Sequence, residues 1–180
     1  MKMSIKFVFT LFCLSLVLVS CKDENSIQTY FVDHQELPEF TSFDVSAKLV
    51  DFSNANLTEE EKDAYESIRK LDILAYRVND KNKDKYQLEL NKAKTVLNNK
   101  KYEELMEFKD NGVNVKISTI GDNDTVDEFL VLASSKEVGF TVIRVLGDDM
   151  KPEELIKLTN KLQNADVDQG QLNNLMDFFK

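Results

Sequence analysis

The chain has 180 residues, with 23 basic and 32 acidic side chains and a formal net charge of −9. This acidity argues against a nucleic-acid partner, because binding to phosphate backbones depends on clustered Lys and Arg. The two cysteines and single histidine argue against zinc sites built from those residues. The length suits one domain held together by its own hydrophobic core.

Residues 1–20 have the composition of an export signal, in which two lysines precede an apolar run from Phe7 to Val19. The run is shorter than the about 20 helical residues that cross a membrane, so it predicts a cleaved signal rather than a permanent span. It ends in LVSC, which resembles the lipobox of bacterial lipoproteins. We expect cleavage between Ser20 and Cys21 and a lipid on Cys21 that anchors the protein to a membrane. The alternative is an ordinary secretory signal with an incidental cysteine.

The residues after the lipobox bear on the destination of the protein. Lys22, Asp23 and Glu24 resemble the short signal that sends Bacteroidota lipoproteins to the cell surface, although a solvated tether has a similar composition. We therefore expect a cell-envelope protein, anchored in the outer membrane rather than the inner one and exposed at the surface. Residues 21–41 would form the lipidated N-terminus and tether, and residues 42–180 a single domain.

The first half of this domain contains both strand and helix patterns. Apolar and polar residues alternate from Phe43 to Leu49, which predicts a strand. Thr58 and Glu61 form a capping box, and apolar residues then recur at helical spacing, which predicts a helix over 59–70. The dense apolar run from Ile73 to Val78 predicts a strand that is covered on both faces.

Two helices are predicted next. Apolar residues at intervals of three and four predict a helix from Tyr86 to Leu97. A shorter helix is expected from Tyr102 to Phe108, and Asn111 and Gly112 would end it.

A meander of three strands is predicted after these helices, with strands at 113–118, 129–133 and 140–146. Pro152 suits the first turn of a helix. A last helix is indicated by four apolar residues at helical spacing: Leu172, Leu175, Met176 and Phe179. Together the elements predict an α+β two-layer sandwich, with an about five-stranded, mostly antiparallel sheet, a C-terminal three-strand meander and helices packed on one face.

Several blocks of the sequence resemble a known family. They are Leu57–Glu60 (LTEE), Lys101–Leu105 (KYEEL), Asp127–Phe129 (DEF) and Arg144–Met150 (RVLGDDM). They resemble a Bacteroidota lipoprotein family of unknown function, domain of unknown function 4252, over roughly residues 26–166. The resemblance implies a single lipoprotein domain. It implies no activity and no catalytic residue, because the family has no established reaction.

Acidic residues form the one candidate catalytic or cation-binding cluster. Two nearby carboxylates can share a proton or hold a hard cation, as in glycosidases. The simpler interpretation is that Asp favours turns and helix starts, where it satisfies backbone donors. The candidate residues lie at a predicted turn and before a predicted helix: Asp122, Asp124, Asp127, Glu128, Asp148 and Asp149.

Three further motifs give weaker signals. Asp80, Asn82 and Asp84 match the first positions of a calcium loop, but Lys and Asn stand where the loop requires Gly and Glu, so a solvated loop is the better interpretation. His34, in the predicted tether, lacks the rigid frame that a catalytic base requires. Thr125 lies in a DTV triplet that resembles an O-glycosylation signal of Bacteroidota exported proteins. We expect no metal and no cofactor.

The sequence is therefore compatible with three functions. We favour a non-catalytic binding or envelope-assembly accessory protein, with an envelope protein as partner. The alternative is a carboxylate-dependent envelope hydrolase acting through Asp148 and Asp149. A third function, a carrier of small ligands, would require an apolar pocket between the sheet and the helices.

Overall fold

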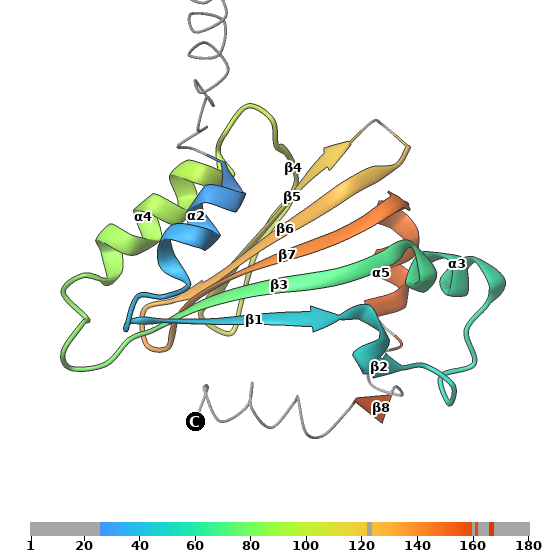
Figure 1. The fold of residues 1–180 in the computed structure, drawn as a ribbon, viewed down its shortest axis with the longest axis horizontal. Helices are drawn as coiled ribbons and strands as arrows, with labels where there is room; N and C mark the ends of the chain where they lie inside the picture. The colour runs from blue at the N-terminus through green and yellow to red at the C-terminus, as the bar shows by residue number, and fades with distance from the viewer. Residues whose placement is uncertain (1–25, 122–123, 160, 162–165, 168–180) are drawn as a thin grey trace, which may run out of the picture.

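Six strands form one antiparallel sheet in the order β1-β3-β7-β6-β5-β4 (Figure 1). This computed structural model describes residues 26–121, 124–159, 161 and 166–167. The last four strands form a meander, because each pairs with the next along the chain. The strands are β1 (Phe40–Ser46), β3 (Ile68–Arg77), β4 (Glu103–Asp110), β5 (Val113–Gly121), β6 (Val126–Ser135) and β7 (Gly139–Met150).

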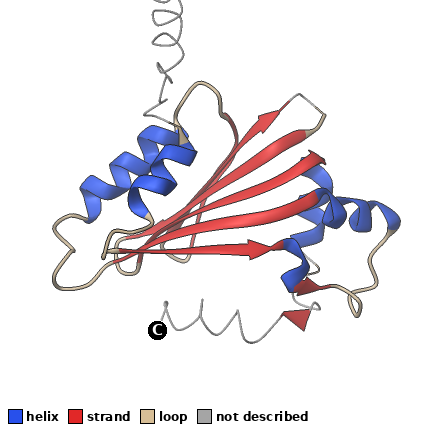
Figure 2. Ribbon diagram, in the orientation of Figure 1, coloured by secondary structure: helices blue, strands red, loops and turns tan. Residues whose placement is uncertain are grey.

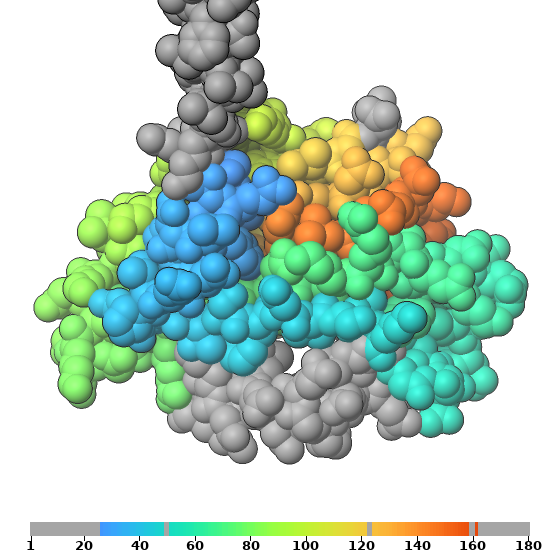
Figure 3. Space-filling view, viewed as in Figure 1, coloured from blue at the N-terminus to red at the C-terminus, as the bar shows by residue number. Residues whose placement is uncertain are grey.

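Two helices, α2 (Ile27–His34) and α4 (Tyr86–Leu97), pack on one face of the sheet (Figure 2). Tyr30 and Phe31 of α2 are buried in the main core with residues of α4 and of strands β3, β6 and β7. The space-filling view shows α2 covering one end of this face, while strands reach the surface at the other end (Figure 3). Residues from Ile27 onward, expected in a tether, thus contribute to the core of the domain.

The other two helices, α3 (Glu59–Ser67) and α5 (Pro152–Thr159), lie together at the opposite end of the sheet (Figure 1). Leu155 of α5 packs in a cluster with Phe129, which lies on the sheet face opposite to that of α2 and α4. The sequence predicts helices on one face only. This prediction is wrong, because α5 packs on the other face. A 3₁₀ turn at Ala47–Leu49 leads into the short strand β2 (Val50–Asp51), which pairs with β8 (Asp166–Val167).

Several local predictions are confirmed. Both hydrogen bonds of the capping box form, since Glu61 N–H donates to the Thr58 hydroxyl and Thr58 N–H donates to the Glu61 carboxylate. Helix α4 has the predicted bounds, and α5 begins at Pro152. The predicted strands of the meander also form, with longer bounds than expected.

The helix predicted from Tyr102 to Phe108 is wrong, because these residues belong mainly to strand β4. Asn111 and Gly112 have φ values of 46° and 85° and join β4 to β5 in a tight hairpin. Positive φ at two successive residues suits a hairpin turn, so this pair does not end a helix as the sequence predicts. The sheet therefore has six strands rather than about five, and the meander four rather than three.

Other sequence predictions lie outside the described residues: the export signal, the lipobox, Lys22 to Glu24, and the last helix. No helix in the described part of the chain is long and apolar enough to cross a membrane.

Candidate functional site

The predicted acidic cluster is not assembled into one site by the described residues. Asp122 lies outside them, and Asp124 and Asp127 are exposed. Thr125, the predicted glycosylation site, is partly exposed just before β6. Asp148 and Asp149 are exposed residues near the end of β7 and do not lie in a loop before a helix.

Glu128 is the buried member of the predicted cluster. Its carboxylate accepts two hydrogen bonds from the Arg144 guanidinium, at 2.6 Å from Nε and 3.0 Å from Nη2. Arg144 Nη1 also lies 3.6 Å from a carboxylate oxygen of Asp72, and all three residues are buried. Asp148 is paired elsewhere, with Arg69 Nε at 3.2 Å. Glu128 and Asp148 thus each have a cationic partner and are not paired with each other.

The sequence contained a signal for this arrangement that the cluster hypothesis overlooked. Residues two apart in a strand point to the same face, so Glu128 shares a face with Leu130 and Leu132. Both of these leucines lie in the main core. Arg144 follows Val142 of the same core by two residues and pairs with Leu130, which places a cation diagonal to Glu128 on the same face.

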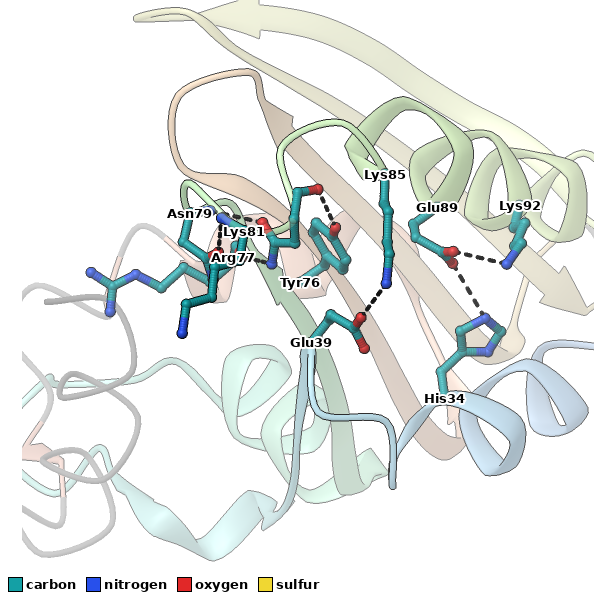
Figure 4. Close-up of polar contacts among 10 residues, drawn as sticks. His34, Glu39, Tyr76, Arg77, Asn79, Lys81, Lys85, Glu89 and Lys92 are labelled. Carbon is teal, nitrogen blue, oxygen red and sulfur yellow. Dashed lines mark hydrogen bonds and ion pairs between the residues drawn. The ribbon is translucent and has the colours of Figure 1, made fainter.

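The loop that matches only the first positions of a calcium loop is held by its own hydrogen bonds. The Asn82 amide donates to the Arg77 carbonyl oxygen at 2.9 Å and accepts from Asn79 N–H at 2.8 Å, while Asn82 is 4% exposed. The Asn82 carbonyl accepts from the buried Tyr76 hydroxyl (Figure 4). No group of three acidic, His or Cys side chains able to hold a metal occurs among the described residues. The Asn82 side chain therefore stabilises the loop.

His34 joins the two helices of the main core. Its Nδ1 donates to the Tyr30 carbonyl oxygen at 2.7 Å, and its Nε2 lies 3.7 Å from the Glu89 carboxylate, which also binds Lys92 (Figure 4). The His34 ring packs against Tyr30 in a tilted arrangement, with 4.1 Å between ring centroids, and meets the Phe40 ring edge-on. Burial, with a smaller contribution from Glu89, raises the pKa of Tyr30 above its usual value. These contacts give His34 a structural role.

The sheet face opposite to α2 and α4 is the distinctive surface of the domain. Strand pairing aligns three rows of side chains across all six strands of this face. Two of these rows lie on either side of a middle row. Among the described residues of those two rows, Glu103 at the β4 edge is the one charged residue. The middle row is apolar throughout: Phe43, Ile73, Ile143, Val131, Ile117 and Met106.

An apolar groove with a volume of about 250 Å³ crosses this face toward α3 and α5. Tyr65 supplies the one polar side-chain group of its lining, and that hydroxyl donates to the Ala47 carbonyl oxygen at 3.0 Å. The groove therefore suits an apolar side chain or acyl chain rather than a polar substrate. Its lining comes from the sheet and from the α3 and α5 end: Ala47, Phe52, Tyr65, Ile68, Leu71, Leu105, Ile117, Phe129, Val131, Val145, Leu155, Ile156 and Leu158.

Strand β4 forms one edge of the sheet beside this groove. All eight of its residues are exposed, including Leu105 at 40%, Met106 at 37% and Phe108 at 46%. An exposed edge strand offers unpaired backbone groups to another strand, and apolar side chains strengthen such pairing. Sequence reasoning missed this surface because it assigned these residues to a helix.

The profile of one family, described as Domain of unknown function (DUF4252), matches residues 30–158. The chain belongs to this family. The DUF4252 match begins inside α2, ends inside α5 and includes the whole six-stranded sheet. No match was found among curated proteins or among solved structures. The predicted family is thus confirmed, whereas its link to lipoproteins and to Bacteroidota stays a prediction.

Proposed function

We propose that this protein is a lipid-anchored lipoprotein of the bacterial cell envelope whose DUF4252 domain binds a protein partner without catalysis. The partner strand would pair with β4, and its apolar side chains would contact Leu105, Met106 and Phe108. The observation that carries this proposal is an edge strand with three exposed large apolar residues. Such edges favour pairing with another chain.

Charge on β4 supports pairing with a selected partner. Glu103, Glu104, Glu107 and Asp110 outnumber the single Lys109 on this strand. Lys116 of the neighbouring strand lies 3.0 Å from Glu104 and partly offsets this charge. Like charges on facing strands repel each other, so the edge disfavours self-association and favours a strand with basic residues.

The membrane anchor is proposed from the N-terminal sequence. The apolar run and LVSC lipobox support lipid attachment at Cys21, while Lys22 to Glu24 support an outer-membrane destination. The net charge of −9 disfavours direct binding to anionic lipid head groups. Attachment would therefore depend on acyl chains, each buried methylene of which contributes about 0.8 kcal/mol.

The hydrolase alternative, expected to act through Asp148 and Asp149, gains no support from the contacts of Asp148 or from those of Glu128 in the same predicted cluster. Each carboxylate has an arginine partner, at 2.6 Å for Glu128 and 3.2 Å for Asp148. A hydrolytic pair would need one protonated and one ionised carboxyl beside a shared substrate position.

Membrane attachment is tested with Cys21→Ser in the full chain. We expect the wild-type protein in washed membranes, with a mass increase on the N-terminal peptide. The Cys21→Ser chain should keep its signal or appear in the soluble fraction. An unmodified Cys21 in the membrane-bound wild type, or equal membrane retention of a Cys21→Ser chain from which the signal has been removed, would reject the anchor.

Partner binding is tested with a photo-crosslinking phenylalanine analogue at position 108 in living cells. Leu88, which is 59% exposed on α4, is the matched control position. We expect a discrete cross-linked species from position 108 alone, and a decrease of about tenfold when Met106→Lys is added. Equal cross-linking from both positions, or none from position 108 in membranes that retain the protein, would overturn the proposal.

A further inference from the structure

The apolar groove has a lining that water solvates poorly. Its thirteen lining residues include no charged side chain, and its one hydroxyl is already hydrogen-bonded. Large contiguous apolar surfaces usually have an occupant, either from the same chain or from a partner. The groove lies partly between the sheet and α5, so an occupant would contact both.

We propose that residues 168–180 of this same chain form an amphipathic helix that packs along the groove. This inference goes beyond the proposed function, since it depends on the groove and on the C-terminal sequence and not on partner binding at β4. Residues 168–180 lie outside the described residues, so their sequence and the position of the preceding strand carry the argument.

The sequence of this segment has one apolar stripe. Leu172, Leu175, Met176 and Phe179 recur at the i, i+3, i+4 and i+7 positions of a helix. The intervening positions are polar apart from Phe178, which lies beside the stripe. A helix of this composition gains most of its stability by burying the apolar side against a surface.

The position of β8 directs the segment toward the groove. Val167 pairs with Val50, which stands between the groove residues Ala47 and Phe52 in the sequence. Leu172 comes five positions after Val167, and five steps of extended chain reach up to about 17 Å. The start of the apolar stripe is therefore within reach of the groove.

The length of the stripe also matches the width of the groove. From Leu172 to Phe179 a helix rises about 10 Å, at 1.5 Å per residue. Neighbouring strands lie about 4.8 Å apart, so this rise covers two strand spacings. Strands β7, β6 and β5 span that width and supply Val145, Val131 and Ile117 to the groove.

The apolar stripe and the groove lining are chemically complementary. Leu, Met and Phe side chains need no hydrogen-bond partner, and the groove offers no free polar side chain. The segment would complete a second helical layer on the face that α5 covers at one end only. Each face of the sheet would then carry a layer of two helices over its own core.

The inference is tested in the mature chain carrying Cys21→Ser, with a photo-crosslinking phenylalanine analogue at position 179. We expect cross-links within one molecule to peptides from β5, β6 or α5. Leu175→Asp should abolish them and increase the fluorescence of an apolar dye several-fold. Asn173→Asp, on the polar side of the predicted helix, is the matched control and should change neither readout.

Three outcomes would overturn the inference. Cross-links between isotopically distinct molecules would assign the groove to a second copy. Equal binding of a dodecanoic acid probe by the wild type and by a chain ending at Val167 would show that the groove is open to acyl chains. Unchanged cross-links in Leu175→Asp would show that the stripe does not dock. None of these results affects cross-linking at position 108, so failure here is distinguishable from failure of the proposed function.

Discussion

Arg144 holds Glu128 with two hydrogen bonds inside the sheet, at 2.6 and 3.0 Å. The two side chains come from neighbouring strands, β7 and β6, and are 9% and 6% exposed. Asp72 on β3 adds a second carboxylate 3.6 Å from the same guanidinium. One arginine therefore links three adjacent strands, β3, β7 and β6, on the face that carries α2 and α4.

Loss of this arginine should destabilise the domain strongly. Arg144→Met leaves the buried Glu128 without its partner, and breaking a buried pair in this way costs about 3–5 kcal/mol. The double variant Arg144→Met with Glu128→Gln should recover part of that loss, because it leaves no unpaired charge at position 128. Urea unfolding of the single and double variants measures the difference. A loss below about 1 kcal/mol in Arg144→Met would show that the pair is not desolvated.

Gly139 should be far less tolerant of substitution than Gly112. A Cβ at Gly139 would collide with the Tyr76 carbonyl oxygen, and its φ of +129° disfavours any side chain. At Gly112 the φ is +85°, but nothing lies within 4 Å of an added Cβ. Gly139→Ala should cost about 3 kcal/mol or more, and Gly112→Ala about 1 kcal/mol. Thermal unfolding of the two variants compares them, and equal losses would contradict the packing argument.

The Thr58 cap should contribute measurably to stability. Thr58→Ala removes the acceptor for Glu61 N–H at 3.2 Å and should cost about 1 kcal/mol. Thr95→Ala is the matched control, because the exposed Thr95 hydroxyl donates only to the carbonyl of Asn91 within α4. Alanine there should be neutral or slightly stabilising. If the two variants lose equal stability in urea, the capping box contributes nothing specific.

The buried Tyr30 should make the domain sensitive to alkaline pH. Burial raises its pKa above the ordinary 10.0, so the folded state retains the phenol proton more strongly than the unfolded state. The resulting stability is fully present below pH 10 and falls as pH rises above it, by up to about 1.4 kcal/mol per pH unit.

Tyr30→Phe tests this dependence. Among the described residues the Tyr30 hydroxyl has no hydrogen-bond partner, so the variant should be within about 0.5 kcal/mol of the wild type at pH 7. Above pH 10 the variant should lose less stability than the wild type. Parallel urea titrations at pH 7, 9 and 11 measure both slopes. Identical slopes would mean that Tyr30 ionises as readily in the folded chain as in the unfolded one.

The parts of the fold that were predictable have signals within a few residues. Thr58 and Glu61 define the start of α3 because a cap is a contact across three residues. Strand β4 was not predictable in this way, because its glutamates, Leu105 and Met106 favour a helix when considered locally. Pairing with β5 overrides that preference. Helix α2 was missed for a related reason, since Tyr30 and Phe31 become core residues only against α4.

The candidate site was predictable only in part. The acidic residues were visible, but their proximity in sequence did not reveal that Glu128 faces Arg144 while Asp148 faces Arg69. The groove depends on which strands lie side by side. Ile117, Val131 and Val145 are far apart along the chain and share one face only because of the strand order.

The sequence by itself determined the family, the α+β class, and the elements whose ends are marked by caps and turns. Those features depend on contacts between residues close along the chain, which a single sequence displays directly. Only the tertiary structure decided that β4 is an exposed edge and that one face of the sheet carries an apolar groove. Both depend on strand pairing between distant residues, and burial of the whole core, rather than any local preference, selects that pairing.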